Sequence, residues 1–238
     1  MPHAQFPMPC PTPNSQFPIP NSQFPIPNVI FFDAVGTLFG VRGSVGEVYS
    51  KTARQFGVNI SVEVLDRTFK ESFRAAPPCT FPGADPKKIP TLEFEWWEAV
   101  ALRTFESAGV LEQFDSWAEF FKELYDRFAT AEPWFIYPDI PSTLERYQSL
   151  DIELGVLSNF DSRLRSVLKE LELADFFSSV TISTEVGAAK PDPLIFATAL
   201  AKHNCIPEEA WHIGDSRQDD YEGANAAGLR GILLERDL

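Results

Sequence analysis

Apolar residues along this chain follow two patterns, which predict two kinds of structure. Short apolar runs rich in β-branched and aromatic side chains occupy residues 29–32, 154–157, 180–182, 211–213 and 232–234. Runs of this length that end at polar or glycine positions are typical of buried strands. Helical spacing fills residues 163–171, 194–203 and 221–227 between them. Strands that alternate with helices predict a parallel sheet with helices on both faces.

The interval 43–131 departs from this alternation because its apolar residues keep helical spacing throughout. The series are Val45, Val48, Tyr49, Thr52 and Phe56; Val62, Leu65, Phe69 and Phe73; Phe94, Trp97, Val100, Ala101 and Phe105; and Trp117, Phe120, Phe121, Leu124 and Phe128. They predict an all-helical insertion of about four helices. An insertion after the first strand would lie over the carboxyl ends of the strands, where open α/β folds bind ligands. The aromatic rings could line a pocket there, but rings at helical spacing more often form a core, and we favour the core.

Residues 1–28 differ in composition from the rest of the chain. They contain nine of the twenty prolines and no Asp, Glu, Lys or Arg, and the segment NSQFPIP at 14–20 recurs unchanged at 21–27. Frequent proline blocks helical and sheet hydrogen bonds, so we expect a disordered or polyproline II tail. A proline-rich docking segment is the alternative. The tandem copy resembles translated repetitive DNA, and we expect the natural start at Met8 or beyond.

Charge and composition exclude several function classes. The chain has 238 residues, a formal net charge of −14 and 44% hydrophobic residues, which suits an α/β domain with a smaller insertion. The negative charge argues against a nucleic-acid partner, because phosphate contacts need clustered Lys and Arg. No apolar run is long enough to span a membrane. Three cysteines without metal-ligand spacing, Cys10, Cys79 and Cys205, indicate neither a disulfide framework nor a zinc site, and a cytoplasmic location fits best.

Polar residues that can carry chemistry follow the predicted strands. Asp33 ends the first strand, where a carboxylate can act as a nucleophile; a turn or helix-capping role is the alternative. Ser158 and Asn159 end the next strand, where a hydroxyl and backbone N–H groups can hold a phosphoryl oxygen at a helix N-terminus. Lys190 precedes a proline, which favours extended backbone, and its ammonium can neutralise the charge of the nucleophile and of a phosphate.

Three more carboxylates, those of Asp215, Asp219 and Asp220, crowd the segment after the strand at 211–213. Like charges this close are unfavourable unless a cation neutralises them, and an oxygen-only ligand set indicates Mg²⁺. Solvated caps for the following helix are the alternative. The three histidines, His3, His203 and His212, offer no competing site, and His212 is expected to be a satisfied core residue of a buried strand.

Four stretches together resemble the haloacid dehalogenase superfamily, in its branch with a helical cap inserted after the first strand. They are FFDAVGTLF (31–39), LSN (157–159), KPDP (190–193) and GDSRQDD (214–220), with Gly223-Ala224 and Ala227-Gly228 after the last. The resemblance implies an α/β fold with a Rossmann-like parallel sheet. It divides the chain into a core at 29–42 and 132–238, an all-helical cap at 43–131 and the tail at 1–28.

The resemblance also implies roles for single residues. Catalytic roles fall to Asp33, Ser158 and Lys190, and substrate binding to Gly36, Thr37 and Asn159. Mg²⁺ would be bound by Asp33, the backbone carbonyl of Val35, Asp215 and Asp220, with Asp219 accessory. The implied reaction is hydrolysis of a small phosphorylated metabolite through an aspartyl-phosphate on Asp33. The sequence leaves the identity of the substrate and the oligomeric state open.

Val35 is the main departure from the phosphatase pattern. Phosphatases of the superfamily have a second aspartate there, which protonates the leaving group and later activates water. General acid–base catalysis is worth about 10²- to 10⁴-fold, so we expect weak turnover without loss of phosphate binding.

Two alternatives follow from Val35. Haloacid dehalogenases also lack the second acid, because halide leaves without a proton, but they use no metal and replace the acidic motif seen here at 214–220. Their cap arginine has several candidates here by position alone: Arg42, Arg54, Arg67 and Arg74. A 2-haloacid dehalogenase-like hydrolase is therefore one alternative, and a non-catalytic phosphometabolite-binding or interaction protein is the other.

Overall fold

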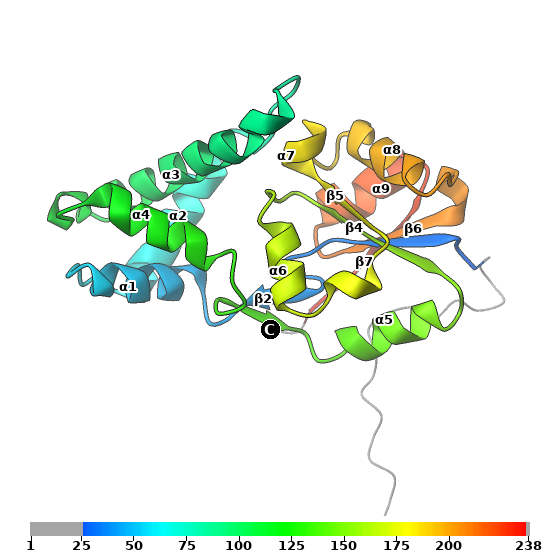
Figure 1. Ribbon diagram of the computed structural model, residues 1–238, viewed down its shortest axis with the longest axis horizontal. Coiled ribbons are helices and arrows are strands. Elements are labelled where there is room, and N and C mark those ends of the chain that lie inside the picture. The colour runs from blue at the N-terminus through cyan, green and yellow to red at the C-terminus, as the bar shows by residue number, and fades with distance from the viewer. Residues whose placement is uncertain (1–25, 237–238) are drawn as a thin grey trace, which may run out of the picture.

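The centre of the molecule is a five-stranded parallel sheet, in a computed structural model that describes residues 26–236. Its strands are β1 (Val29–Phe32), β4 (Glu153–Ser158), β5 (Ser179–Ile182), β6 (Ala210–Gly214) and β7 (Arg230–Leu233). They lie in the order β5-β4-β1-β6-β7, and every neighbouring pair is parallel (Figure 1). The predicted parallel sheet is therefore confirmed, although the last strand begins and ends earlier than the predicted 232–234.

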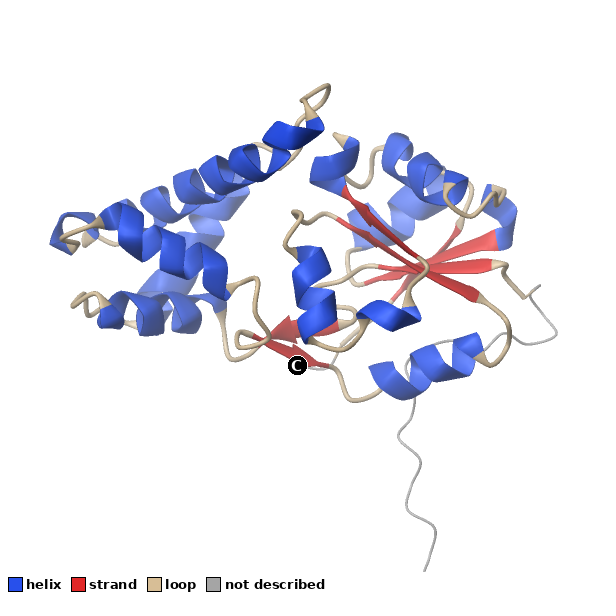
Figure 2. Cartoon of the chain, viewed as in Figure 1, coloured by secondary structure: helices blue, strands red, loops and turns tan. Residues whose placement is uncertain are grey.

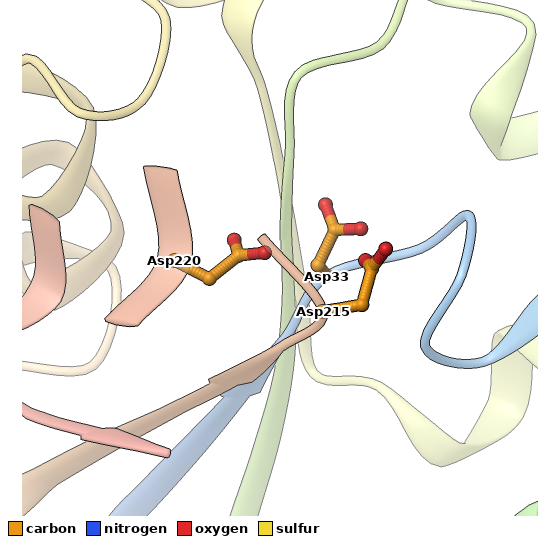
Figure 3. A group of neighbouring side chains, drawn as sticks. All are labelled: Asp33, Asp215 and Asp220. Carbon is orange, nitrogen blue, oxygen red and sulfur yellow. The ribbon is translucent and has the colours of Figure 1, made fainter. Parts of the chain in front are cut away.

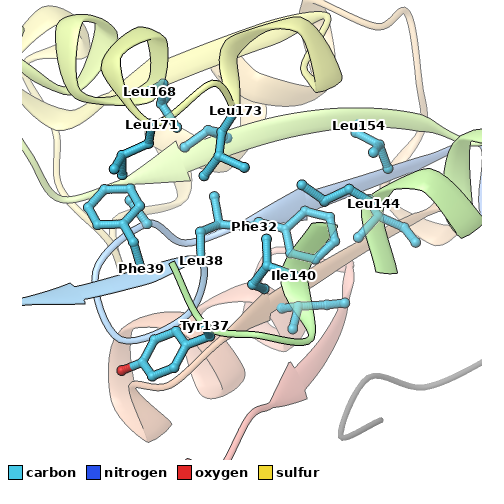
Figure 4. Packing of buried hydrophobic residues seen from close by; sticks show 14 of the residues in the cluster. Phe32, Leu38, Phe39, Tyr137, Ile140, Leu144, Leu154, Leu168, Leu171 and Leu173 are labelled. Carbon is cyan, nitrogen blue, oxygen red and sulfur yellow. The ribbon is translucent and has the colours of Figure 1, made fainter. Parts of the chain in front are cut away.

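Strand β1 is buried completely because its side chains alternate between two hydrophobic cores. The helices beside the sheet are α5 (Ile140–Gln148), α6 (Leu164–Glu170), α7 (Ser183–Val186), α8 (Pro193–Ala201) and α9 (Gly223–Ala226). Ile30 and Phe32 belong to the core that includes apolar residues of α5 and α6 (Figure 4). Val29 and Phe31 belong to the core that includes residues of α8 and α9. Helices therefore cover both faces of the sheet, as the sequence predicted.

The interval 43–131 contains the four predicted helices, which lie to one side of the sheet (Figure 2). They are α1 (Val45–Gln55), α2 (Val62–Ala75), α3 (Ile89–Ser107) and α4 (Trp117–Arg127). Three of them begin after a serine, Ser44, Ser61 or Ser116, whose hydroxyl accepts a hydrogen bond from a backbone N–H of the first turn. The helices share a separate core that includes Leu65 and Phe105. Their aromatic stripes therefore do form a core.

A two-stranded antiparallel ribbon, which the apolar pattern did not predict, joins the helices to the sheet. It pairs β2 (Phe39–Val41) with β3 (Trp134–Ile136). The chain leaves the sheet through β2, forms the four helices, and returns through β3. Strands of three residues are too short for a recognisable alternation of apolar and polar positions, which is why the sequence pattern missed them.

The segment after β6 is also more irregular than predicted. A π-helix spans Arg217–Glu222 and leads into α9, where the sequence predicted one helix over 221–227. Short 3₁₀ helices span Pro86–Lys88, Leu111–Gln113, Ala174–Phe176 and Pro207–Glu209. No helix within residues 26–236 is long and apolar enough to cross a membrane. The predicted tail lies almost entirely outside the described residues, and the division into core, cap and tail remains a prediction.

Candidate active site

Side chains from three neighbouring strands meet at the carboxyl edge of the sheet. Asp33 follows β1, Ser158 ends β4 and Asp215 follows β6, and these strands are adjacent in the sheet. Asp220 comes from the π-helix that follows. One carboxylate oxygen each of Asp33, Asp215 and Asp220 lies within 4.8 Å of the other two (Figure 3). The fold therefore gathers the predicted carboxylates where open α/β sheets bind ligands.

Lys190 is the cation that balances this cluster. Its buried Nζ donates hydrogen bonds to Asp33 Oδ1 at 2.7 Å, to Asp220 Oδ1 at 2.5 Å and to the carbonyl of Leu157 at 3.1 Å. Burial alone would lower the pKa of Lys190, but the charges of Asp33 and Asp220 outweigh it and raise the pKa above its usual value. Lys190 is therefore a fixed positive charge beside the predicted nucleophile.

The side chain of Asn159 holds Lys190 in place. Asn159 Oδ1 accepts a hydrogen bond from the backbone N–H of Lys190 at 2.7 Å, and Asn159 Nδ2 donates to the carbonyl of Lys190 at 3.0 Å. The sequence predicted substrate binding for this residue, whereas its amide group positions the lysine. Ser158, the preceding residue, is buried and lines the adjoining cavity.

Asp220 accepts hydrogen bonds on both carboxylate oxygens. Oδ1 accepts from Lys190 and lies 2.8 Å from His212 Nε2, and Oδ2 accepts from the backbone N–H of Ser216 at 2.9 Å. Burial would raise the pKa of Asp220, but Lys190 and His212 together hold it well below the usual range. Asp220 therefore remains ionised and holds Lys190 by a second ion pair, in addition to that with Asp33.

His212 contacts this site, which sequence reasoning did not foresee. Burial lowers the pKa of His212, so the ring is neutral and its Nε2–H donates to Asp220. The sequence does contain a signal for this contact. Side chains along a strand alternate with a period of two, so His212 lies on the same face of β6 as Gly214. A Cβ at Gly214 would lie 2.1 Å from the Asp220 carboxyl carbon, so that face is the one that Asp220 covers.

Asp215 faces the cavity and is the carboxylate with the most strongly raised pKa of the cluster. The surrounding protein restricts its hydration, and this, with the nearby charges of Asp33 and Asp220, raises the pKa of Asp215 to about 6. Thr37 Oγ1 donates to Asp215 Oδ1 at 3.4 Å. Gly36 has a φ of 89°, and a Cβ there would lie 2.5 Å from an oxygen of Asp215. Glycine is thus required at position 36 for two reasons: the positive φ of the backbone and the close approach of the Asp215 carboxylate.

A cavity of about 350 Å³ separates the carboxylates from the helices α1 to α4. Predicted site residues that line it are Asp33, Val35, Ser158, Asn159, Lys190, Asp215, Asp219 and Asp220. The opposite wall is mostly aromatic and includes Tyr49, Phe69, Phe73, Phe121 and Phe128. The core role that the sequence favours is confirmed for Tyr49, Phe69, Phe121 and Phe128, which pack in the helical core. The same rings, together with the exposed Phe73, also face the cavity.

Polar side chains join the helices to the sheet domain beside this cavity, and none of them was predicted. Trp97 of α3 donates its indole N–H to Asp161 Oδ2 at 2.7 Å. Glu93, one turn earlier, is fully buried and accepts hydrogen bonds from the backbone and hydroxyl of Ser162 and from the hydroxyl of Thr184. Their partners are separated by long stretches of sequence, so no local motif marks them.

Arg163 is the arginine that lines the cavity, and it comes from the sheet domain. Its Nε and Nη2 donate to the two oxygens of Asp161 at 2.8 and 2.7 Å, and its Nη1 donates to the carbonyl of Tyr125 at 2.9 Å. The four arginines considered from position, Arg42, Arg54, Arg67 and Arg74, are exposed and do not line this cavity. The structure thus offers no cap arginine at this site among the described residues.

Comparisons with known proteins agree with the fold. The sequence profile of the family described as haloacid dehalogenase-like hydrolase matches residues 27–228. The mouse haloacid dehalogenase-like hydrolase domain-containing protein 3 is 34% identical over 206 residues, which cover 87% of this chain and 81% of the mouse protein. The phosphoserine phosphatase of Thermus thermophilus is 33% identical over 172 residues, 61% of this chain and 69% of that protein.

Solved structures resemble this fold as well. The L-2-haloacid dehalogenase of Xanthobacter autotrophicus superposes with a TM-score of 0.59 and 20% identity, over 85% of this chain and 75% of that one. Identity this low indicates a shared fold and nothing about the substrate. The match of the family profile to most of the chain, together with the four motifs gathered at the sheet edge, shows that this protein belongs to the haloacid dehalogenase-like hydrolase family.

Proposed function

We propose that this chain is a Mg²⁺-dependent phosphatase that attacks small phosphate esters with the carboxylate of Asp33. The observation that carries the proposal is the contact of Asp33 Oδ1 with Lys190 Nζ at 2.7 Å, within a carboxylate cluster that lines a cavity. Such a cluster suits binding of a cation and a phosphate together, because each neutralises the other's charge. The similarity to a phosphatase of Thermus thermophilus supports a phosphate ester as substrate.

The reaction would proceed in two displacements at phosphorus. In the first, an oxygen of Asp33 bonds to phosphorus, the bond to the ester oxygen breaks, and its electron pair leaves with the ester oxygen. In the second, water attacks the aspartyl-phosphate, the bond between Asp33 and phosphorus breaks, and phosphate is released. Lys190 lies beside Asp33 throughout and stabilises negative charge on the phosphoryl oxygens.

The residues present fit a divalent cation. The donors are oxygens alone, which Mg²⁺ prefers, and three carboxylates converge with only one lysine in direct contact. Asp33 and Asp215 would hold the ion together with the carbonyl of Val35, and Asp220 would add negative charge from behind Lys190. The bound ion would supply positive charge to the phosphate oxygens and relieve the repulsion that raises the pKa of Asp215.

Val35 limits which esters would react quickly. It lines the cavity two residues after the nucleophile, and a valine side chain carries no proton to give to the leaving group. The departing oxygen must therefore leave as an anion and take its proton from water. Aryl and acyl phosphates tolerate this because their leaving groups are weak bases, whereas alkyl phosphates do not.

A 2-haloacid dehalogenase is a weaker candidate. Val35 agrees with it, but the substrate carboxylate would need a free cation in the cavity. The cations that line the cavity among the described residues are Lys190 and Arg163, and both are already ion-paired. Phosphoryl transfer needs no additional cation beyond Mg²⁺ and Lys190, so we favour the phosphatase.

The deciding experiment compares two chemistries with and without metal. Wild-type protein, Asp33→Asn and the control Asp151→Asn, at an exposed turn, are assayed with acetyl phosphate, 4-nitrophenyl phosphate and 2-chloropropionate, in Mg²⁺ and in EDTA. We expect release of phosphate that needs Mg²⁺ and falls by about 10³-fold or more in Asp33→Asn only.

Other outcomes identify the alternatives. Halide release that persists in EDTA would show that the protein is a dehalogenase and would overturn the proposed phosphatase function. Phosphate and Mg²⁺ that raise the melting temperature without any turnover, in wild type and Asp33→Asn alike, would indicate a binding protein.

A further inference from the structure

The wall of the cavity opposite the carboxylates is unusually apolar for a site that binds a phosphate. Helices α1, α2, α3 and α4 contribute Tyr49, Phe69, Trp97 and Phe121, and Trp134 of β3 completes this side. The rings contact one another: Tyr49 meets Phe69 with centroids 5.5 Å apart. A flat, neutral group placed among such rings gains dispersion and edge-to-face contacts.

The charged side chain on this side of the cavity is already neutralised. Arg163 forms a two-point ion pair with Asp161, and its guanidinium lies 3.7 Å from the centroid of the Tyr125 ring. Asp161 in turn also accepts the indole N–H of Trp97. Among residues 26–236, these contacts leave neither a free cation nor a free anion on the wall to pair with a charged substrate group.

We infer that the organic half of the substrate is an uncharged, apolar group about the size of one aromatic ring, and that the wall selects against esters carrying a carboxylate or an ammonium. This inference rests on the proposed phosphatase function and names its substrate class. A charged group placed against this aromatic wall would lose its hydration without gaining a partner there. The volume of about 350 Å³ lies near the lower end of ligand pockets, which favours a single ring over a nucleotide.

Val35 favours the same substrate class, by an argument that does not depend on the aromatic wall. A phenol, like the tyrosine side chain, has a pKa of about 10, far below that of water at about 15.7. A phenolate therefore leaves without a protonating residue more readily than an alkoxide does. The apolar wall and the missing acid thus favour the same kind of ester.

A matched pair of esters tests the inference. 4-Methylphenyl phosphate and 4-carboxyphenyl phosphate are similar in size, and the carboxylate-bearing phenol is at least as good a leaving group. Chemistry alone would not favour the methyl compound, so a preference for it must come from binding. We expect kcat/KM to be roughly 10- to 100-fold higher for the methyl compound, mainly through KM, and O-phosphoserine to be poorer still.

A cation placed at the rim should weaken the preference for the methyl compound. Phe73 lines the cavity and is 45% exposed, so Phe73→Arg adds a charge without burying it. We expect the ratio of the two kcat/KM values to shift by about tenfold or more toward the carboxyl compound. The control Leu150→Arg, at a residue that is 41% exposed and outside the cavity, should leave the ratio unchanged.

Binding of the two esters to the Asp33→Asn variant separates the inference about the substrate class from the proposed phosphatase function. Calorimetry with the two esters measures the preference of the wall whether or not the wild-type protein turns over. Turnover of acetyl phosphate with equal or reversed preference between the esters would overturn the inference and leave the phosphatase standing. A preference for the methyl compound in binding, without hydrolysis of any phosphate, would overturn the phosphatase and leave the apolar ligand class.

Discussion

The sheet edge and the helical wall face each other across one cavity, yet their side chains are held in different ways. At the edge, Lys190 Nζ donates three hydrogen bonds and Asp220 accepts on both oxygens. On the wall, rings such as Phe69 and Phe73 are held by stacking, with centroids 5.6 Å apart. Directional hydrogen bonds hold the reacting groups at defined positions, as a reaction at phosphorus requires. Ring packing, in contrast, defines only the shape of the cavity wall.

This difference predicts different effects of substitution. Changes at the edge should alter turnover of every ester by a similar factor, because all share the same reacting phosphoryl group. Changes on the wall, such as Phe73→Arg, should alter the ratio between esters. Four further substitutions test this distinction, in order of decreasing expected effect.

Restoring an acid at the edge should give the largest change. Val35→Asp places a carboxyl group in the cavity, two residues after the nucleophile. We expect turnover of alkyl phosphates to rise by about 10²- to 10⁴-fold, with a much smaller change for 4-nitrophenyl phosphate, whose leaving group needs no proton. Val35→Asn, of similar size, is the control and should not accelerate either ester. Equal gains from Asn and Asp would show that proton transfer is not the cause.

Removing the lysine should reduce both turnover and stability. Lys190→Met leaves the negative charges of Asp33 and Asp220 without their shared partner. We expect kcat/KM to fall by about 10²- to 10³-fold for all esters alike. Breaking a buried ion pair by removing one partner costs about 3–5 kcal/mol, so the midpoint of urea unfolding should also fall. Lys169→Met, at an exposed position of α6, should change neither. Loss of activity with only one ester would contradict a role in phosphoryl transfer.

A methyl group at Gly36 tests the metal site. Gly36→Ala and the control Gly57→Ala both strain a backbone with positive φ, but a Cβ at Gly36 meets the Asp215 carboxylate whereas at Gly57 it meets open space. Both should lose about 1–2 kcal/mol of unfolding free energy from strain. Only Gly36→Ala should lose the increase in melting temperature that Mg²⁺ gives to the wild-type protein. Retained Mg²⁺ stabilisation in Gly36→Ala would argue against Asp215 as a ligand.

The junction between the helices and the sheet domain should depend on pH through Glu93. Burial raises the pKa of Glu93 above its ordinary 4.5, despite hydrogen bonds from Ser162 and Thr184. The folded protein therefore binds this proton more tightly than the unfolded chain. The resulting stability is fully present below the unfolded pKa and is lost as pH rises through the folded pKa.

Glu93→Gln removes that titration. We expect the stability of Glu93→Gln relative to wild type to increase by about 1 kcal/mol between about pH 4 and about pH 8, measured by urea unfolding. Glu106→Gln, at an exposed position of the same helix, should show no such trend. A difference that stays constant with pH would mean that folding does not shift the pKa of Glu93.

Local sequence was enough to predict the strands and the residues at their ends. Asp33 follows four buried apolar residues, so both the strand β1 and the position of the carboxylate could be inferred. The helices were predicted from the same kind of pattern, whereas β2 and β3 were missed because three residues carry too little periodicity. The segment after Gly214 was predicted as acidic, but its π-helix depends on packing that Ser216 and Asp220 make after folding.

The supporting residues of the site were harder to infer. His212 is buried, as predicted for a core histidine, but only the period of two along β6 could have indicated its contact with Asp220. The substrate-binding role of Asn159 stays a prediction, and the structure adds hydrogen bonds from its amide group to the backbone of Lys190. Arg163 gave no signal, because its contact with the carbonyl of Tyr125 spans 38 positions of sequence, although its ion-pair partner Asp161 lies only two residues before it.

The sequence by itself determined which groups this protein has for chemistry: a carboxylate after β1, a lysine before a proline, an acidic segment after β6, and a valine where a second acid would stand. These follow from residue type and from strand patterns that are local in the chain. The tertiary structure alone decided which charges remain free. Lys190 reaches Asp33 across 157 positions of sequence, and Arg163 reaches the backbone carbonyl of Tyr125 across 38. The cavity therefore has carboxylates and a lysine on one side and an apolar wall on the other. Pairing of charges depends on distances of a few ångströms between distant segments, and only folding sets those distances.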